Sequence, residues 1–159
     1  LLTCGDGEER AALERQVAEA GIQRHVRFHG ELDDAALVRC YQQCDLFALP
    51  NREVQGDIEG FGMVLLEAQA CGKPVLAGAS GGTAETMRVP ETGRIVPCEG
   101  PERLAETLKE LLLDASQRQR MGAAARRWAV ECFGWESLVE QARAIFGQLD
   151  GDRREERPS

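Results

Sequence analysis

The sequence predicts an α/β protein built on a parallel sheet with helices on both faces. Short apolar segments of strand length alternate with longer segments whose apolar residues recur at helical spacing. Glycine ends several of the helical segments, as at Gly21 and Gly72. This alternation is typical of parallel strands joined by helices. In such sheets ligands bind at the carboxyl ends of the strands, so the loops that follow the strands are where a site is expected.

The N-terminal part predicts two strands and two helices. Residues 1–4 form a short apolar strand that a "GDG" turn ends, and a helix follows over 7–20. "HVRFH" alternates at strand period over 25–29, and Gly30 ends it. Asp33 or Asp34 can cap the second helix, which we expect to run to about Gln43.

The rest of the chain continues the same alternation. "DLFALP" predicts a buried strand that ends at Pro50, and an irregular polar stretch leads from there to the next helix. "PVLAGAS" and "TGRIVP" predict two more strands, with a short helical segment near 84–87 between them. Three further helices are expected to start near Pro101, Asp114 and Trp135. We therefore expect one Rossmann-like domain over residues 1–149 and a charged, disordered tail over 150–159.

Composition excludes several classes of function. A net charge of −8 argues against non-specific binding to nucleic acid or to anionic lipid. No apolar run approaches the roughly 20 residues of a membrane helix.

The cysteines and histidines do not predict a metal site. The six cysteines contain no C-x-x-C pair, so we expect reduced core cysteines in a cytoplasmic protein. His25 and His29 would lie about 13 Å apart on one strand and cannot share a metal. The first residues look like the end of a strand, which suggests a piece of a longer protein.

The stretch "EGFGMVLLEAQACGKPV" runs from Glu59 to Val75. Its glycines, Gly60 and Gly62, allow unusual dihedrals and close approach to a ligand just before a helix. The first N–H groups of that helix have no acceptor within it, so they can donate hydrogen bonds to a phosphate. The helix is apolar nearly all round, which predicts burial, with Glu67 inside it.

Two interpretations of these carboxylates follow from spacing alone. Glu67 leans back toward the helix N-terminus, where it could accept hydrogen bonds from ribose hydroxyls in the same region as Glu59. Alternatively, Glu59 is a loop or capping acid, and Glu67 pairs with a buried backbone group or an arginine.

The whole stretch closely resembles the E-x7-E motif of retaining glycosyltransferases with the GT-B fold, a family that includes bacterial phosphatidylinositol mannosyltransferases. "LLTCGDGEE", "SGGTAETM", "ETGRIVP" and "FGWESL" also match this family, so the resemblance extends to about Leu149. It implies that the chain is the C-terminal, donor-binding half of a GT-B enzyme. Such an enzyme passes a sugar from a UDP- or GDP-sugar to an acceptor hydroxyl, without a metal ion and with retained configuration.

The resemblance also implies roles for individual residues. Glu59 would be the catalytic-site acid that contacts the donor sugar, and Glu67 would hold the ribose. Backbone N–H groups of four residues would meet the sugar and pyrophosphate: Phe61, Gly62, Met63 and Val64, with Gly60 beside them. The base would lie against the backbone of Leu32. Asp34 would read a guanine edge or act as a helix cap, while Gly5 and Gly7 would line the donor cleft or simply form turns. The same ambiguity applies to Gly81 and Gly82.

The basic pair that neutralises the donor pyrophosphate in this family has no counterpart here, and neither has the N-terminal acceptor domain. We therefore expect the chain alone to be inactive. We also expect that any peripheral contact with the inner face of a membrane requires the absent domain.

Three alternatives to a transferase remain. An NAD-dependent dehydrogenase is disfavoured because "GDGEER" has Arg10 in place of a third glycine. A non-enzymatic nucleotide or sugar sensor and a nucleotide-sugar epimerase of the same fold both stay open.

Overall fold

The computed structural model describes residues 1–56, 58 and 60–155, with side chains through residue 147. Glu59, the predicted catalytic residue, lies outside the described residues. The chain forms two compact units, Leu1–Gln43 and Cys44–Ser159. Each unit is described separately below.

The first unit contains a two-stranded parallel sheet and two helices. Strand β1 (Leu2–Thr3) pairs with β2 (Arg27–Phe28), with Leu2 opposite Arg27. Between them lie helix α1 (Arg10–Glu19) and a single 3₁₀ turn, η1 (Gln23–His25). Helix α2 (Asp34–Gln43) follows, and Asp33 caps it by accepting a 2.7 Å hydrogen bond from the N–H of Ala36. Of the two acids that the sequence offered as caps, Asp33 therefore has that role.

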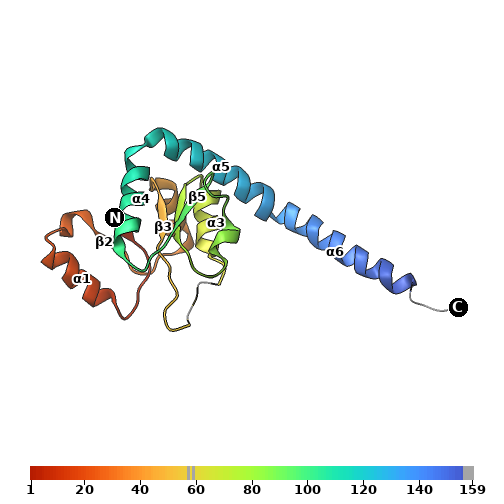
Figure 1. Ribbon diagram of the computed structural model, residues 1–159, viewed down its shortest axis with the longest axis horizontal. Coiled ribbons are helices and arrows are strands. Elements are labelled where there is room, and N and C mark those ends of the chain that lie inside the picture. The colour runs from red at the N-terminus through yellow and green to blue at the C-terminus, as the bar shows by residue number, and fades with distance from the viewer. Residues whose placement is uncertain (57, 59, 156–159) are drawn as a thin grey trace. The chain divides into compact units, whose positions relative to one another are not determined.

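The second unit contains a parallel sheet of three strands (Figure 1). Strand β4 (Val75–Gly78) is fully buried and lies between β3 (Phe47–Leu49) and β5 (Gly93–Val96). Burial on both faces explains why "VLAG" reads as a continuous apolar run instead of an alternating one. The β3, β4 and β5 strands all end on the same edge because they are parallel, which places their following loops together.

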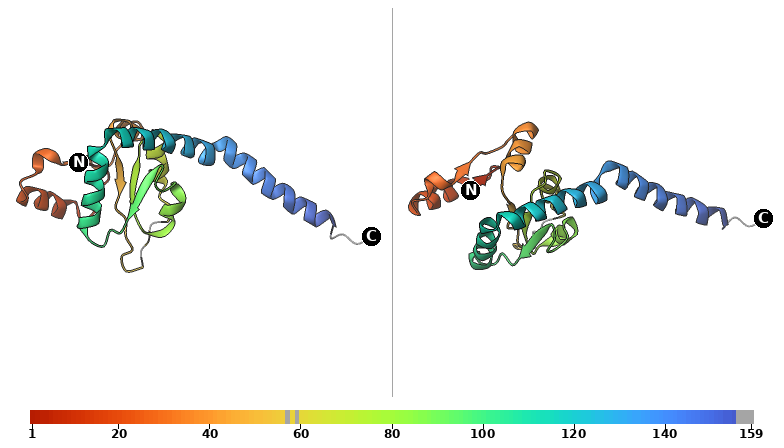
Figure 2. Two further views of the ribbon diagram at one scale, coloured as in Figure 1. Left: turned by 45° about the horizontal axis from the view of Figure 1, so that its top comes forward. Right: turned by 90° about the horizontal axis from the view of Figure 1, so that it is seen from above.

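Helices surround this sheet (Figure 2). They are α3 (Met63–Ala70), the 3₁₀ segment η2 (Gly81–Thr86), α4 (Pro101–Leu113) and α5 (Ala115–Phe133). The core lies where α3, α4 and α5 meet the strands, and Leu65, Leu76 and Leu111 are fully buried there. Helix α5 approaches the end of α3 so closely that a Cβ on Gly122 would lie 2.2 Å from the carbonyl oxygen of Gly72. The predicted α/β architecture is thus confirmed.

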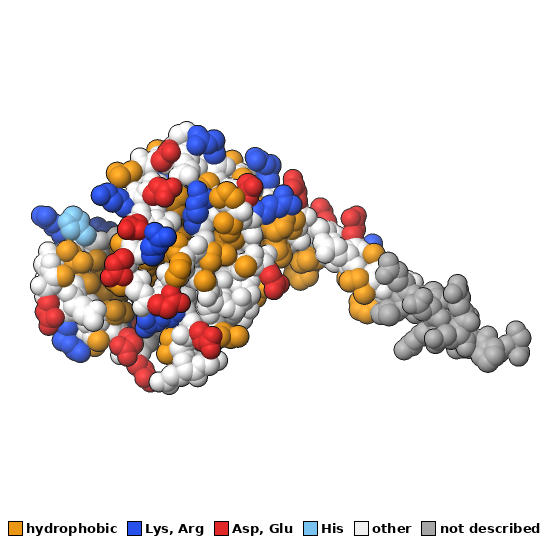
Figure 3. Space-filling view, viewed as in Figure 1, with side chains coloured by type: hydrophobic (Ala, Val, Ile, Leu, Met, Phe, Trp, Pro, Cys, Tyr) orange, Lys and Arg blue, Asp and Glu red, His pale blue; other side chains and the backbone are white. Residues whose placement is uncertain are grey.

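The last helix, α6 (Trp135–Glu155), leaves the sheet and projects away from it (Figures 1 and 2). Its apolar side chains stay exposed, and hydrophobic atoms gather where α5 passes into α6 (Figure 3). Trp135 is 83% exposed and Phe146 is 68% exposed. The described residues of this chain therefore leave an apolar face of α6 uncovered. The predicted domain over 1–149 and tail over 150–159 stay predictions.

The cysteines differ from the sequence-based expectation of core residues. None of these six described cysteines forms a disulfide, but Cys4 is exposed and the other five are only half-buried. Apolar neighbours in the sequence do not guarantee burial, since several of these residues lie at the ends of helices: Cys40 and Cys44 around the end of α2, Cys71 after α3 and Cys132 near the end of α5.

Candidate functional site

Asn51 joins the loops that follow β3 and β4. Its Oδ1 accepts a 2.9 Å hydrogen bond from the N–H of Gly78, and its Nδ2 donates to the carbonyl oxygen of Ser80 at 3.3 Å. Gly78 cannot be replaced here, because a Cβ would lie 1.6 Å from the Asn51 carbonyl oxygen. The carboxyl ends of the two strands are therefore held together by one amide side chain. Sequence reasoning did not single out Asn51, although its position directly after a strand and a proline was the available signal.

The loop before α3 packs against the loop after β4. The N–H of Gly82 donates to the carbonyl oxygen of Gly60 at 3.1 Å, and a Cβ on Gly82 would come within 2.5 Å of the same oxygen. Thr83 is buried beneath this contact and donates from Oγ1 to the carbonyl oxygens of Ser80 and Gly78, at 2.8 and 3.1 Å. The sequence left the role of Gly82 open, and the structure shows that it allows two loops to meet.

Gly62 directs the chain into α3. It is the N-cap with φ +83°, a left-handed conformation that costs L-residues about 1–2 kcal/mol. The N–H of Leu65 donates to the carbonyl oxygen of Gly62 at 2.9 Å. Earlier N–H groups of the helix, at Met63 and Val64, have no acceptor within the helix. They carry the positive end of the helix dipole, so this turn can receive an anionic group.

Glu67 is exposed, which corrects the prediction that it is a carboxylate buried in an apolar helix. Helix α3 is buried on one side only. Leu65, Leu66 and Ala68 face the core, whereas Met63 is 60% exposed and lies one turn before Glu67 on the same face. Residues four apart in a helix share a face, so Glu67 and the open first turn are on the same side of α3. Its exposure removes the burial cost and leaves the carboxylate accessible to a ligand.

The polar side chain that α3 does bury is Gln69. It is 0% exposed, and its Nε2 donates to the carbonyl oxygens of Thr86 at 2.7 Å and Leu65 at 3.1 Å. Its Oε1 has no hydrogen-bond partner among the described residues. Gln69 thus connects α3 to η2, the segment that carries Gly82 and Thr83. Sequence reasoning missed this role because a glutamine beside alanines gives no periodic signal.

Phe61 is held by an aromatic cluster at the end of α5. Its ring centroid lies 6.0 Å from that of Phe133, which in turn meets Trp128 edge-on at 5.8 Å. Arg88 lies over the Trp128 ring at 4.3 Å, and Trp128 Nε1 donates to the carbonyl oxygen of Thr86. The side chain of Phe61 therefore points into protein contacts, which leaves its backbone as the part that could meet a ligand.

In the first unit, the turns that follow β1 and β2 are joined. The N–H of Gly5 donates to the carbonyl oxygen of Gly30 at 2.8 Å, and both glycines have positive φ. Arg10 lies against Gly30 and forms ion pairs with Asp6 and Glu14 at 3.0 Å. Gly7, in contrast, has open space where a Cβ would be and no positive φ, so nothing in its geometry requires glycine.

Asp34 and Leu32 lie between this turn and the body of α2. Asp34 is exposed in the first turn of α2 and does not have the capping role, which Asp33 takes. Leu32 is half-buried. The structure therefore places Gly5, Gly7, Leu32 and Asp34 in the first unit, and Gly60 to Glu67 in the second. Within the second unit it places Gly60 and Gly62 beside the start of α3 and Glu67 one turn further along the same helix.

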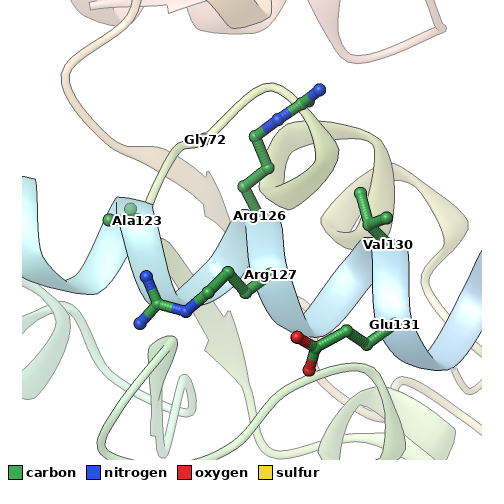
Figure 4. Close-up of a pocket in the computed structure, with 7 residues that line it drawn as sticks. Gly72, Ala123, Arg126, Arg127, Val130 and Glu131 are labelled. Carbon is green, nitrogen blue, oxygen red and sulfur yellow. The ribbon is translucent and has the colours of Figure 1, made fainter.

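A separate pocket of about 510 Å³ lies along α5 (Figure 4). Two arginines line it, but Arg126 points away from Arg127 and donates to the carbonyl oxygen of Ala70, at the end of α3. Arg126 therefore satisfies a helix C-terminus, and the two guanidinium groups do not converge on a common ligand.

The part of the chain that the structure describes has neither a cluster of metal-ligating side chains nor a membrane-spanning helix. No three His, Cys, Asp or Glu side chains there gather as metal ligands. None of the helices in those residues is long and apolar enough to span a bilayer. Independence from metal stays a prediction.

Comparison with known proteins gives consistent matches. A family model described as "Glycosyl transferases group 1" matches residues 1–128. A GDP-mannose-dependent monoacylated alpha-(1-6)-phosphatidylinositol monomannoside mannosyltransferase from Corynebacterium glutamicum is 40% identical over 148 residues, which cover 92% of this chain and 38% of that protein. A GDP-mannose-dependent alpha-(1-6)-phosphatidylinositol monomannoside mannosyltransferase from Mycobacterium tuberculosis is 36% identical over 87% of this chain and 37% of its own. The chain thus spans under two fifths of the length of these two relatives.

Solved structures match the fold. Sucrose-phosphate synthase from Thermosynechococcus elongatus superposes with a TM-score of 0.79 at 30% identity, covering 96% of this chain and 38% of that one. Anabaena HepE in complex with UDP and glucose gives a TM-score of 0.79 at 24% identity, over 92% of this chain and 40% of that one.

Proposed function

Because the chain belongs to the group 1 family of glycosyl transferases, we propose that it forms the donor-binding part of a retaining glycosyltransferase. The donor is a nucleoside diphosphate sugar, and the acceptor group is a hydroxyl. Relatives named as GDP-mannose-dependent favour a GDP-linked donor, with mannose as the first sugar to test. The solved structure of HepE with UDP keeps a uridine donor among the candidates.

The observation that carries this proposal is the start of α3. Gly62 in its left-handed conformation and the contact between Gly60 and Gly82 leave the first N–H groups of the helix open at the carboxyl ends of β3 and β4. Helix N-termini at this edge of a parallel sheet bind phosphate groups. We assign the pyrophosphate to the backbone of Phe61, Gly62, Met63 and Val64.

Glu67 has the position and exposure to accept hydrogen bonds from ribose hydroxyls. It lies one turn into α3 on the same face as Met63. A carboxylate that accepts two hydroxyl donors forms charge-assisted hydrogen bonds, which are stronger than neutral ones. We assign the donor sugar to Glu59, following the spacing of the motif, and the base to the turn around Leu32 and Asp34 in the first unit.

The acceptor site and the basic groups opposite the pyrophosphate belong, in this proposal, to the remaining part of the protein, because the chain covers under two fifths of its relatives. The apolar stripe of α6, with Trp135 and Phe146 exposed, is the surface that would pack against that part. Contact with a membrane, at its cytoplasmic face, would also be made there.

Titration calorimetry of the intact protein with GDP, UDP and NAD tests the proposal. We expect one nucleoside diphosphate to bind and NAD not to bind. A donor screen with analysis of the product then separates transfer from hydrolysis or epimerisation, because only transfer yields a glycoside. If neither GDP nor UDP bound the intact protein, the proposal would be wrong.

A further inference from the structure

The first unit contains a pocket of about 620 Å³ between the strands and α2. Its lining is basic and apolar: Leu1, Leu2, Arg24, His25, Arg27, His29, Leu32, Ala36, Arg39, Cys40 and Gln43. None of the carboxylates in residues 1–43 is part of this lining, although the chain as a whole has a net charge of −8. A basic side chain and a histidine lie next to each other on the surface of this unit (Figure 3).

The basic residues reach the pocket from two walls. Arg27 on β2 and His29 directly after it are two apart in sequence, and residues at this spacing point to one side of an extended chain. Arg24 and His25, in the preceding turn η1, line the pocket as well. On the other wall, Arg39 lies three residues after Ala36 on α2, and this spacing places both on one helix face. Cations from the strand and the helix therefore border the same space.

The arginines of this pocket have no acidic partners among the described residues. In the described part of the chain, Arg24, Arg27 and Arg39 form no ion pair, and Arg24 Nε donates to His25 Nε2 at 3.0 Å. Arg10 of the same unit behaves in the opposite way and pairs with both Asp6 and Glu14. Two carboxylates of this unit thus neutralise Arg10, whereas the charged side chains that line the pocket are all basic.

We propose that this pocket binds a small, soluble compound that carries two or more phosphate charges. The site lies in the first unit, whereas the donor pyrophosphate is assigned to the turn at α3, and the proposal does not depend on that assignment. Leu32 is shared with the donor site, since it lines this pocket and the base is assigned to its backbone.

The chemistry of the lining favours phosphate. A guanidinium group presents a planar fork of donors that matches two phosphate oxygens, and Arg27 and Arg39 supply such forks from opposite walls. The volume falls within the roughly 300–1,000 Å³ of pockets that enclose small molecules. Leu2, Leu32 and Ala36 add apolar surface for a ring or carbon chain. The negative net charge of the chain repels anions at long range. A phosphate compound can therefore bind only where a local cluster of basic residues attracts it.

Calorimetry with inorganic pyrophosphate tests the proposal on the intact protein. Saturating GDP is present throughout, so that pyrophosphate cannot report on the donor site. We expect the double variant Arg27→Gln/Arg39→Gln to bind pyrophosphate about tenfold more weakly, or worse, because two charge-assisted contacts are lost. Arg15→Gln is the matched control, since Arg15 is an exposed arginine of the same unit outside the pocket. Circular dichroism confirms that each variant is folded.

Three results would overturn the proposal. Equal weakening by Arg15→Gln would show that binding depends only on net charge. Unchanged binding in the double variant would place pyrophosphate elsewhere. Binding to vesicles of phosphatidylglycerol and phosphatidylcholine, but not to pyrophosphate, would make the basic residues a lipid-contact surface instead. The affinity for GDP should be the same in all variants, which keeps this test independent of the proposed transferase function.

Discussion

Helices α3 and α6 both carry apolar side chains but have different surroundings. Helix α3 is covered by the sheet, by η2 and by α5, so Leu65 and Ala68 are fully buried and only one face, with Met63 and Glu67, reaches solvent. Helix α6 projects from the sheet, and the apolar side chains that the structure describes on it are partly or largely exposed. The difference shows that an apolar stripe identifies a face that needs a partner, whereas the tertiary structure determines whether this chain supplies that partner.

The largest expected effect is on the free energy of unfolding, which should fall much more for a truncation in α3 than for one in α6. Leu65→Ala should lower the free energy of unfolding by about 2–5 kcal/mol, because the buried side chain leaves a cavity. The matched change Ile145→Ala on α6 should cost at most about 0.5 kcal/mol in the chain alone, because that side chain is 59% exposed. Urea denaturation measures both. Equal losses would mean that α6 is packed as tightly as α3.

The next effect concerns the exposed face of α3. Glu67→Ala should weaken binding of the nucleoside diphosphate by about 1.5–3 kcal/mol, the value of a hydrogen bond to a charged group. Stability should change by less than about 0.5 kcal/mol, because the side chain is exposed. Calorimetry and urea denaturation give the two numbers. Glu110→Ala, on the exposed surface of α4, is the control and should change neither. A variant of Glu67 that unfolds, while its folded fraction binds normally, would show a structural role.

A smaller effect tests the turn that starts α3. Gly62→Ala should cost about 1–2 kcal/mol of stability, because alanine must take a left-handed conformation. Gly60→Ala is the control, since Gly60 has open space around its missing Cβ and no positive φ. Thermal or urea unfolding should distinguish the two variants. If both were equally stable, the backbone of Gly62 would not require its observed conformation.

The smallest effect concerns pH. Burial raises the pKa of the Cys44 thiol, and the nearby Lys73 offsets this only in part. The folded state therefore holds the proton more tightly than the unfolded state, in which thiols ionise near pH 8.5. Its contribution to stability is complete below that pH and is lost as the pH rises through the raised pKa. We expect the free energy of unfolding to fall above about pH 8.5, and Cys44→Ala to reduce the slope. An unchanged slope would assign the effect to other groups.

Much of the fold followed from local patterns. The start of α5 is an example, because Asp114 accepts a 2.8 Å hydrogen bond from the N–H of Gln117, as the capping signal indicated. Pro101 begins α4, and Gly72 with positive φ follows α3. These features depend on residues close together in the chain, so a single sequence is enough to find them.

The site was predicted less completely. The motif spacing identified the turn at Gly60 and Gly62 and the position of Glu67. It did not identify Asn51, which joins residues that are 27 and 29 positions away, or Gln69, which joins α3 to η2. Contacts of this kind depend on which loops meet in space, and no local pattern records them.

The sequence by itself determined the order of strands and helices, the glycines that turn the chain, and the spacing between Glu59 and Glu67. Those properties depend on backbone dihedrals, caps and periodicity within a few residues. Only the tertiary structure decided that Glu67 is exposed while Gln69 is buried, and that the apolar residues of α6 stay uncovered. The reason is physical: burial is a property of the surroundings of a side chain, and those surroundings come from segments that are distant in the sequence.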